Sequence, residues 1–144
     1  MIFDHLGVVV ASLEAGRSHL EQLLGVQDWS ASVEDPLQRV LVQFGWDASG
    51  VCYELIAPAG EEGPLREALR TGKNILNHVA YRVPDLEAAM DRARSLGSMP
   101  LGPPRPAVAF QGRRVVFLLT RLRMILELIE ETPSLPEERP PHHA

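Results

Sequence analysis

The sequence has little of three features, and each shortage excludes a class of protein. Its single cysteine, Cys52, rules out an internal disulfide, fits a reducing compartment and is expected to be a small buried hydrophobe. Basic residues number 14 against 19 acidic ones, and the net charge of −5 argues against nucleic-acid binding. No apolar run is long enough to span a bilayer, so we expect no membrane segment.

The first residues carry a further expectation about location. Asp4 and His5 interrupt any early apolar stretch, so we expect no secretory signal peptide and a cytoplasmic protein. The chain has 144 residues, of which 45% are hydrophobic. This is the size of one domain, with enough apolar side chains to bury a core.

What the sequence does contain is an internal repeat. The segment around His5 aligns with the segment around His78 at an offset of 73 residues. A short apolar run around Glu54 aligns with a similar run around Glu127 at the same offset. Self-similarity at one fixed period indicates a duplicated structural unit.

The repeated residues are of the types that bind metals. A lone His or Glu on a strand is usually exposed or simply hydrogen-bonded, but four at equivalent places in two copies are harder to explain that way. Buried carboxylates are also costly unless they are paired or metal-bound. Two His and two Glu brought to one point suit a divalent transition metal. We therefore predict a metal site formed by His5, Glu54, His78 and Glu127.

Apolar periodicity and turn residues predict the order βαβββ in both halves. Module 1, about residues 1–58, is expected to have a helix at 13–24 and strands at 2–10, in the stretch from Gly25 to about Asp35, at 38–44 and at 51–56. Module 2, about 74–131, is expected to have a helix from Asp85 to about 96, a proline-rich loop or edge at 100–106, and strands at 76–83, 114–119 and 124–130. A linker helix is predicted over about 61–72, and a disordered Pro-rich tail over 132–144.

Side-chain alternation along strands predicts what surrounds the histidines. If His5 and His78 face the site, their second neighbours Gly7 and Ala80 do too, and these small residues are expected to leave room for a small ligand. The intervening positions are bulky and apolar, which is typical of faces that pack against helices.

Three polar residues are candidates for substrate binding. Arg82 falls on the predicted face of His78, and Arg123 on that of Glu127, so both can bring positive charge into the same concave surface. Gln38 is a third candidate. Surface solvation is the alternative role for most of the arginines.

These segments resemble the vicinal oxygen chelate (VOC) superfamily, also called the glyoxalase/bleomycin resistance/dioxygenase fold. The resemblance covers about residues 2–131 and is closest to the methylmalonyl-CoA epimerase branch. It is carried by Asp4-His5-Leu6-Gly7-Val8, by residues 76–87, by Gly112-Arg113-Arg114-Val115-Val116-Phe117-Leu118 and by residues 125–130. The resemblance implies an α+β fold, a single VOC domain over 1–131, in which two βαβββ modules form a curled, barrel-like mixed sheet around a metal.

The resemblance also implies a chemistry. A divalent metal ion (Zn, Ni, Co, Mn or Mg) would stabilise the enolate formed when a proton next to a carbonyl is removed. Glu127 is the first candidate for the base and Glu54 the second, with His5 and His78 as fixed neutral ligands. A small-molecule substrate, such as an acyl-CoA or another thioester, and a homodimer are expected; module exchange between subunits would let two chains share the site.

The sequence departs from the epimerase pattern at two positions. Epimerases of this branch often have Gln where this chain has Glu54, and a second glutamate where it has Leu37. Epimerisation is easiest with a base on each face of the α-carbon, so the loss of one leaves Glu34 or Asp35 as neighbouring substitutes. Three alternatives stay open: a glyoxalase I-like lyase, a non-catalytic antibiotic-type binding protein, and a metal-dependent dioxygenase, against which the second carboxylate argues.

Overall fold

The computed structural model describes residues 1–131, so the predicted tail lies outside the described residues. Its elements follow the expected order, with a short strand, β7, and a 3₁₀ turn, η1, added to module 2. In chain order they are β1 (Ile2–Val9), α1 (Leu13–Leu24), β2 (Val33–Asp35), β3 (Val40–Trp46), β4 (Cys52–Pro58), α2 (Pro64–Thr71), β5 (Leu76–Val83), α3 (Leu86–Ser95), β6 (Met99–Pro100), β7 (Arg105–Pro106), η1 (Val108–Phe110), β8 (Arg114–Leu119) and β9 (Ile125–Glu130).

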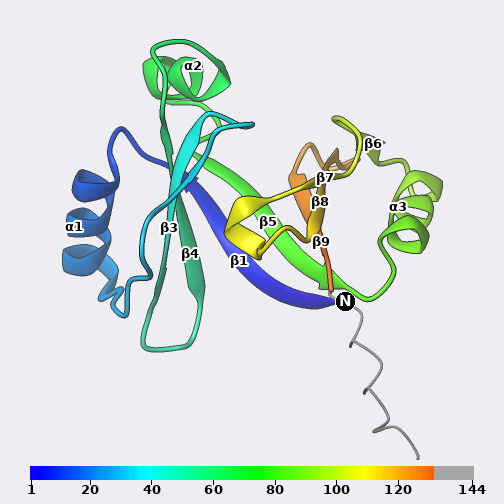
Figure 1. Ribbon diagram of the computed structural model, residues 1–144, viewed down its shortest axis with the longest axis horizontal. Coiled ribbons are helices and arrows are strands. Elements are labelled where there is room, and N and C mark those ends of the chain that lie inside the picture. Colours follow the sequence, from blue (N-terminus) through cyan, green and yellow to red (C-terminus); the bar gives the residue numbers. More distant parts are fainter. Residues whose placement is uncertain (132–144) are drawn as a thin grey trace, which may run out of the picture.

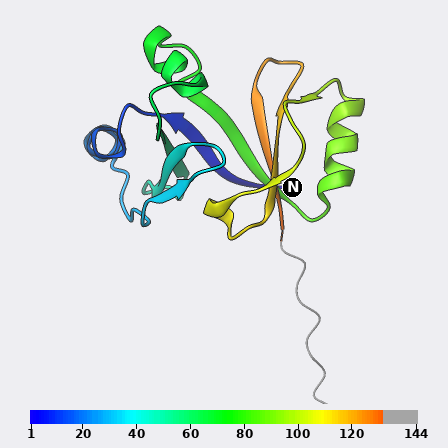
Figure 2. The same cartoon turned by 45° about the horizontal axis from the view of Figure 1, so that its top comes forward.

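The strands form one mixed sheet that curls without closing. Its order is β2-β3-β4-β1-β5-β9-β8-β6, with β7 paired to β8. Strands β1 and β4 are parallel, as are β5 and β9, while β1 and β5 run antiparallel where the two modules meet. Figures 1 and 2 show this sheet between α1 on one side and α3 on the other. The predicted α+β fold with a curled mixed sheet is confirmed.

Local sequence signals set the ends of the two long helices. The Ser12 hydroxyl accepts a hydrogen bond from the amide of Ala15 and begins α1, and Gly25 ends it in a left-handed conformation with φ of 66°. The Asp85 carboxylate accepts from the amide of Ala88 and begins α3. These caps bound the two helices that the sequence predicts at 13–24 and from Asp85 to about 96.

The predicted strand at 38–44 begins later than expected. The Asp35 carboxylate accepts hydrogen bonds from the amides of Leu37 and Gln38, so these two residues form a turn and β3 starts at Val40. Gln38 therefore lies in a turn rather than on a strand. From Val40 onward the alternation holds, because Val40 and Val42 pack into one apolar cluster.

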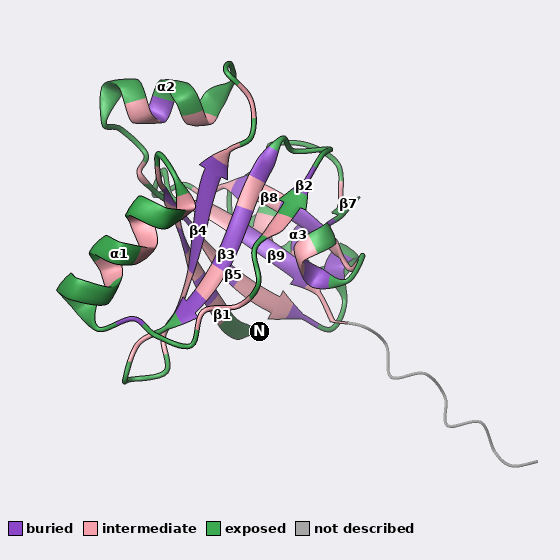
Figure 3. Cartoon of the chain, turned by 60° about the vertical axis from the view of Figure 1, so that its left-hand side comes forward, coloured by how far each residue is buried: buried purple, intermediate pink, exposed green. Residues whose placement is uncertain are grey.

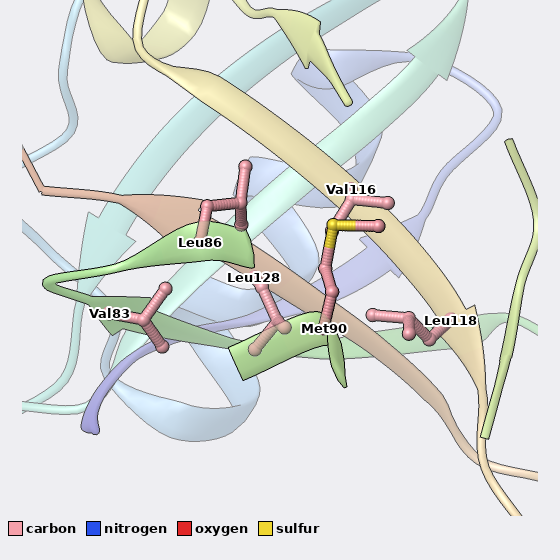
Figure 4. Close-up of a cluster of buried hydrophobic side chains, with 6 residues drawn as sticks. All are labelled: Val83, Leu86, Met90, Val116, Leu118 and Leu128. Atoms are coloured by element: carbon pink, nitrogen blue, oxygen red, sulfur yellow. The ribbon is translucent and has the colours of Figure 1, made fainter. Parts of the chain in front are cut away.

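The two long helices pack differently on the sheet. Helix α3 buries Leu86 and Met90 against strands β5, β8 and β9 (Figure 4). Helix α1 has no buried residue, and Figure 3 shows it without a buried segment. The bulky residues predicted to face the helices are half-buried in both modules, at Leu6 and Val8 of β1 and at Val79 and Tyr81 of β5.

Two further expectations concern Cys52 and the membrane. Cys52 is buried, and desolvation raises the pKa of its thiol to about 12, as for an inert core residue. Within residues 1–131, no helix combines the length and apolar character needed to cross a bilayer. The cytoplasmic location stays a prediction.

Candidate functional site

Four central strands each contribute one polar side chain to the inner face of the curled sheet. His5 comes from β1, Glu54 from β4, His78 from β5 and Glu127 from β9. All four side chains are buried, although they belong to the residue types that avoid the interior. All come from one chain, so the site does not require modules exchanged between subunits.

The donor atoms of these residues lie within 4.0 Å of one another in five pairs. The two Nε2 atoms of His5 and His78 are 3.1 Å apart. The Glu54 Oε1 lies 3.6 Å from the Nε2 of His5 and 3.5 Å from that of His78. Glu127 reaches the same nitrogens through different oxygens, Oε1 at 4.0 Å from His5 and Oε2 at 3.3 Å from His78. We call these four residues the His₂Glu₂ cluster.

The pKa shifts in the cluster show that burial opposes its charged forms. Desolvation raises the pKa of Glu54 to about 7, although the charge of His5 lowers it. Desolvation and the charges of Glu54 and Asp4 raise the pKa of Glu127 well above its usual value. Desolvation and the charge of His5 lower the pKa of His78 to about 3. A bound cation would reverse these penalties on the carboxylates.

Three observations fit a divalent cation to the cluster. The Glu127 Oε1 is buried without a hydrogen-bond partner, which is costly for a carboxylate oxygen. The donor distances are close to the spacing, about 3.0–3.4 Å, of neighbouring ligands that each lie about 2.1 Å from one ion. His5, Glu54 and His78 also offer one donor atom each within 4.8 Å of the other two. Two imidazoles with carboxylates suit several divalent metals.

Gly7 has a different role from the one its size suggests. It faces His78 across the β1–β5 pairing, and a Cβ added to it would overlap the His78 imidazole. His5 faces Ala80 in the same way. The expectation that these small residues leave room for a ligand is therefore wrong at Gly7, because the imidazole fills that space.

A cavity of about 350 Å³ opens onto one side of the cluster. Glu54, His78 and Glu127 line it, while His5 lies fully buried beneath. Its remaining lining is largely apolar, with Val40, Val42, Ile56, Pro64, Leu65, Leu101, Ala107, Ala109, Phe117 and Ile125. Such a cavity holds a small ligand against the cluster and limits the access of water.

The three predicted substrate-binding residues lie in different places. Gln38 lines the cavity. The Arg82 Nε lies 3.1 Å from the Asp4 carboxylate, and Arg82 is not among the residues that line the cavity. Arg123 lines a smaller neighbouring cavity that also reaches His78.

Two further polar residues line the cavity, and only one of them was a candidate from the sequence. Asp35, which the sequence offers with Glu34 as a substitute for the missing glutamate, is buried there. Asn77 also lines the cavity, and its amide oxygen is 2.9 Å from the Nδ1 of His78. The repeat offered a signal for Asn77, because it aligns with Asp4 directly before the other histidine.

The sequence and the fold agree with comparisons to known proteins. Residues 4–117 match the family model described as the glyoxalase/bleomycin resistance protein/dioxygenase superfamily. An ethylmalonyl-CoA/methylmalonyl-CoA epimerase from Cereibacter sphaeroides is 30% identical over 116 residues, which cover 80% of this chain and 85% of that protein. The predicted resemblance to the epimerase branch is thereby confirmed.

Solved structures show the same fold at lower identity. A hypothetical protein from Bacillus halodurans superposes with a TM-score of 0.77 at 21% identity, covering 93% of this chain and 96% of that one. The methylmalonyl-CoA epimerase from Mycobacterium tuberculosis gives 0.73 at 24% identity, covering 91% and 88%. A Streptomyces coelicolor methylmalonyl-CoA epimerase variant in complex with 2-nitronate-propionyl-CoA gives 0.72 at 20%, covering 92% and 99%. The chain therefore belongs to the glyoxalase/bleomycin resistance protein/dioxygenase superfamily.

Proposed function

We propose that this protein is a metal-dependent enzyme that removes a proton next to the thioester carbonyl of an acyl-CoA, in the manner of an epimerase. The observation that carries the proposal is the buried His₂Glu₂ cluster at the side of an apolar cavity. The related epimerase from Cereibacter sphaeroides supports a malonyl-type acyl-CoA as the substrate class.

His5, Glu54, His78 and Glu127 would hold the metal. When bound, the cation acts as a Lewis acid that stabilises the negative charge of an enolate. Glu127 takes the proton from the α-carbon, because it lines the cavity and its Oε1 has no hydrogen-bond partner.

Inversion at the α-carbon needs a second proton carrier on the opposite face, and we assign this role to Asp35. The side chain of Leu37 is 70% exposed and carries no proton, whereas Asp35 is buried and lines the cavity. Its Oδ1 accepts two backbone hydrogen bonds, which fixes the carboxylate and leaves Oδ2 for a substrate.

The test is deuterium exchange into methylmalonyl-CoA and ethylmalonyl-CoA in D₂O, with the protein loaded with Co²⁺ or Zn²⁺. We expect exchange by the wild type and a loss of about 10²–10⁴-fold in Glu127→Gln. Glu130→Gln is the matched control, because Glu130 lies on the same strand but pairs with Arg114. Asp35→Asn is expected to keep exchange and lose inversion.

The outcomes separate the remaining functions. No exchange by a folded, metal-loaded wild type would overturn the proposal. Tight substrate binding without exchange would then indicate the non-catalytic binding protein. Turnover of a hemithioacetal without acyl-CoA exchange would indicate the glyoxalase-like lyase.

We further propose a homodimer in solution. Phe3 is 39% exposed on the outer side of the β1–β5 junction, where its ring packs edge-on against Tyr81 with centroids 5.6 Å apart. Ile2 and Leu76, at the ends of the same strand pair, are exposed as well. Light scattering of the purified protein tests this, with a monomeric mass as the contradicting result.

A further inference from the structure

The junction between the two modules contains two irregularities, one before each histidine of the cluster. Along the β1–β5 pairing the register moves from Phe3 opposite Tyr81 to His5 opposite Ala80, which leaves Asp4 as an extra residue. It moves again between Gly7 and Val8, where the partner changes from His78 to Leu76, which leaves Asn77 as an extra residue. Such bulges redirect a side chain and are common next to active sites.

Both extra residues direct their side chains to the adjacent imidazole. The Asp4 Oδ2 lies 2.7 Å from the Nδ1 of His5, and the Asn77 Oδ1 lies 2.9 Å from the Nδ1 of His78. A carboxylate or amide oxygen can only accept, so each Nδ1 donates its proton. Each Nε2 is then left unprotonated, with its lone pair available to a metal. The two Nε2 atoms lie 3.1 Å apart, and a cation bound by both lone pairs would stabilise this close approach.

The two acceptors differ in charge and in surroundings. Asp4 is an anion, and its second oxygen, Oδ1, forms an ion pair with the Nε of Arg82 at 3.1 Å. Asn77 is neutral and lines the substrate cavity. An anionic acceptor makes the imidazole a stronger electron donor, so His5 and His78 are unequal ligands in otherwise equivalent positions.

We propose that Asp4 and Asn77 are the positioning residues of the two imidazoles, and that Asp4, supported by Arg82, makes His5 the firmer metal ligand. The inference deepens the proposed function, because it rests on a metal bound at the His₂Glu₂ cluster. It also gives Arg82 a role as the counter-charge of Asp4. His78, the less firmly held imidazole, then lines the cavity beside the substrate together with Glu54 and Glu127, while His5 is fully buried.

The test uses isosteric substitutions that change only the charge of the acceptor. Asp4→Asn and Asn77→Asp each keep an oxygen beside the imidazole. We expect the affinity for Zn²⁺, measured by competition with a chromophoric chelator, to fall about 10–100-fold in Asp4→Asn and to rise in Asn77→Asp. Arg82→Gln should lower it less than Asp4→Asn, because the carboxylate remains.

A second measurement reports the tautomers directly. In the metal-free protein, ¹⁵N NMR of the imidazoles should show protonated Nδ1 in both histidines of the wild type. Asp4→Ala should mix the tautomers of His5 alone, and Asn77→Ala those of His78 alone. Asp4→Asn should restore the tautomer of His5 but not the affinity, which separates positioning from charge. Circular dichroism identifies any alanine variant that does not fold. In that case the test uses the isosteric variant at the same position, Asp4→Asn or Asn77→Asp.

The outcomes distinguish this inference from the function on which it rests. Wild-type protein that binds Zn²⁺, with Asp4→Asn and Asn77→Asp within about twofold of it, would overturn the inference and leave the proposed function standing. Unchanged tautomers in both alanine variants would overturn it too. A wild type that binds no Zn²⁺, Co²⁺, Ni²⁺ or Mn²⁺ would overturn both.

Discussion

The two modules share a topology and each contributes one His and one Glu to the His₂Glu₂ cluster, yet they are stabilised in different ways. In module 2, α3 buries Leu86 and Met90 in a core with β5, β8 and β9 (Figure 4). In module 1, α1 buries no residue (Figure 3). Its Leu23 and Leu24 are exposed. The buried apolar cluster of module 1, Val40, Val42 and Ile56, packs against Leu65 of the linker helix, α2.

This difference separates two demands on a duplicated unit. The inner face of each copy must bring one imidazole and one carboxylate to within about 4 Å of the others, and few side chains satisfy that geometry. On the outer face, the only requirement is that apolar side chains are covered, and many combinations of residues achieve this. The two copies therefore agree on the inner face and differ on the outer one.

The largest expected effect is on stability, and it compares the two helices. Leu86→Ala should lower the free energy of unfolding by about 2–5 kcal/mol, because it opens a cavity in a closed core. Leu20→Ala, at a half-buried position of α1, should cost about 1 kcal/mol. Chemical denaturation of both variants measures the two values.

The control is Leu23→Ala, at an exposed position that should stay within about 0.5 kcal/mol of the wild type. Equal losses of unfolding free energy in Leu20→Ala and Leu86→Ala would contradict the proposed difference between α1 and α3. They would mean that another surface covers α1 in solution, and repeating the measurement at several protein concentrations would reveal a second copy of the chain.

The next effect is on metal affinity and compares the residues that face the two histidines. Gly7→Ala places a methyl group on the His78 imidazole, so it should weaken Zn²⁺ binding by about 1–3 kcal/mol. Ala80→Gly, at the position that faces His5, only removes a methyl group and should change affinity little. Calorimetric titration of the metal-free proteins tests both. Similar affinities for Gly7→Ala and the wild type would show that His78 does not bind the metal in this orientation.

Much of the fold follows from local sequence signals. Ser12 and Gly25 set the ends of α1, and the apolar run at 114–119 coincides with β8, because caps and short apolar runs act over a few residues. The members of the His₂Glu₂ cluster followed from the repeat, since residues at one offset occupy equivalent places in two copies of a fold.

Other features depend on long-range geometry and could not be predicted. Assigning side chains to the two faces of a strand by alternation assumes a regular strand. The bulges at Asp4 and Asn77 interrupt this alternation. The ion pair between Arg82 and Asp4 was therefore not predicted. The contact of Gly7 with His78 depends on the register between β1 and β5. The late start of β3 depends on the Asp35 side chain competing for backbone amides.

The smallest expected effect is on the pH dependence of stability and compares the two carboxylates in metal-free protein. Burial raises the pKa of Glu54 from 4.5 to about 7, so the folded protein holds this proton more tightly than the unfolded chain. The resulting stabilisation of the fold is fully present below pH 4.5 and is lost as the pH rises through 7. Burial lowers the pKa of His78 from 6.5 to about 3, so the contribution of neutral His78 to the stability of the fold is lost as the pH falls below 6.5. Between pH 4.5 and 6.5, Glu54 lowers the stability with rising pH while His78 raises it. Above pH 6.5 only the carboxylates change the stability. Glu54→Gln should therefore gain stability relative to the wild type as the pH rises from 5 to 7.5, measured by thermal unfolding in EDTA.

Glu127→Gln sharpens this last comparison. Because burial and the charge of Glu54 both raise the pKa of Glu127, its stabilising contribution is also lost as pH rises, and Glu127→Gln should become more stable relative to the wild type as pH increases. Saturating Zn²⁺ should reverse the sign for both variants, since a bound cation favours the ionised carboxylates that the substitutions remove. Parallel pH profiles for the wild type and both variants in EDTA would show that neither carboxylate holds a proton in the folded, metal-free protein.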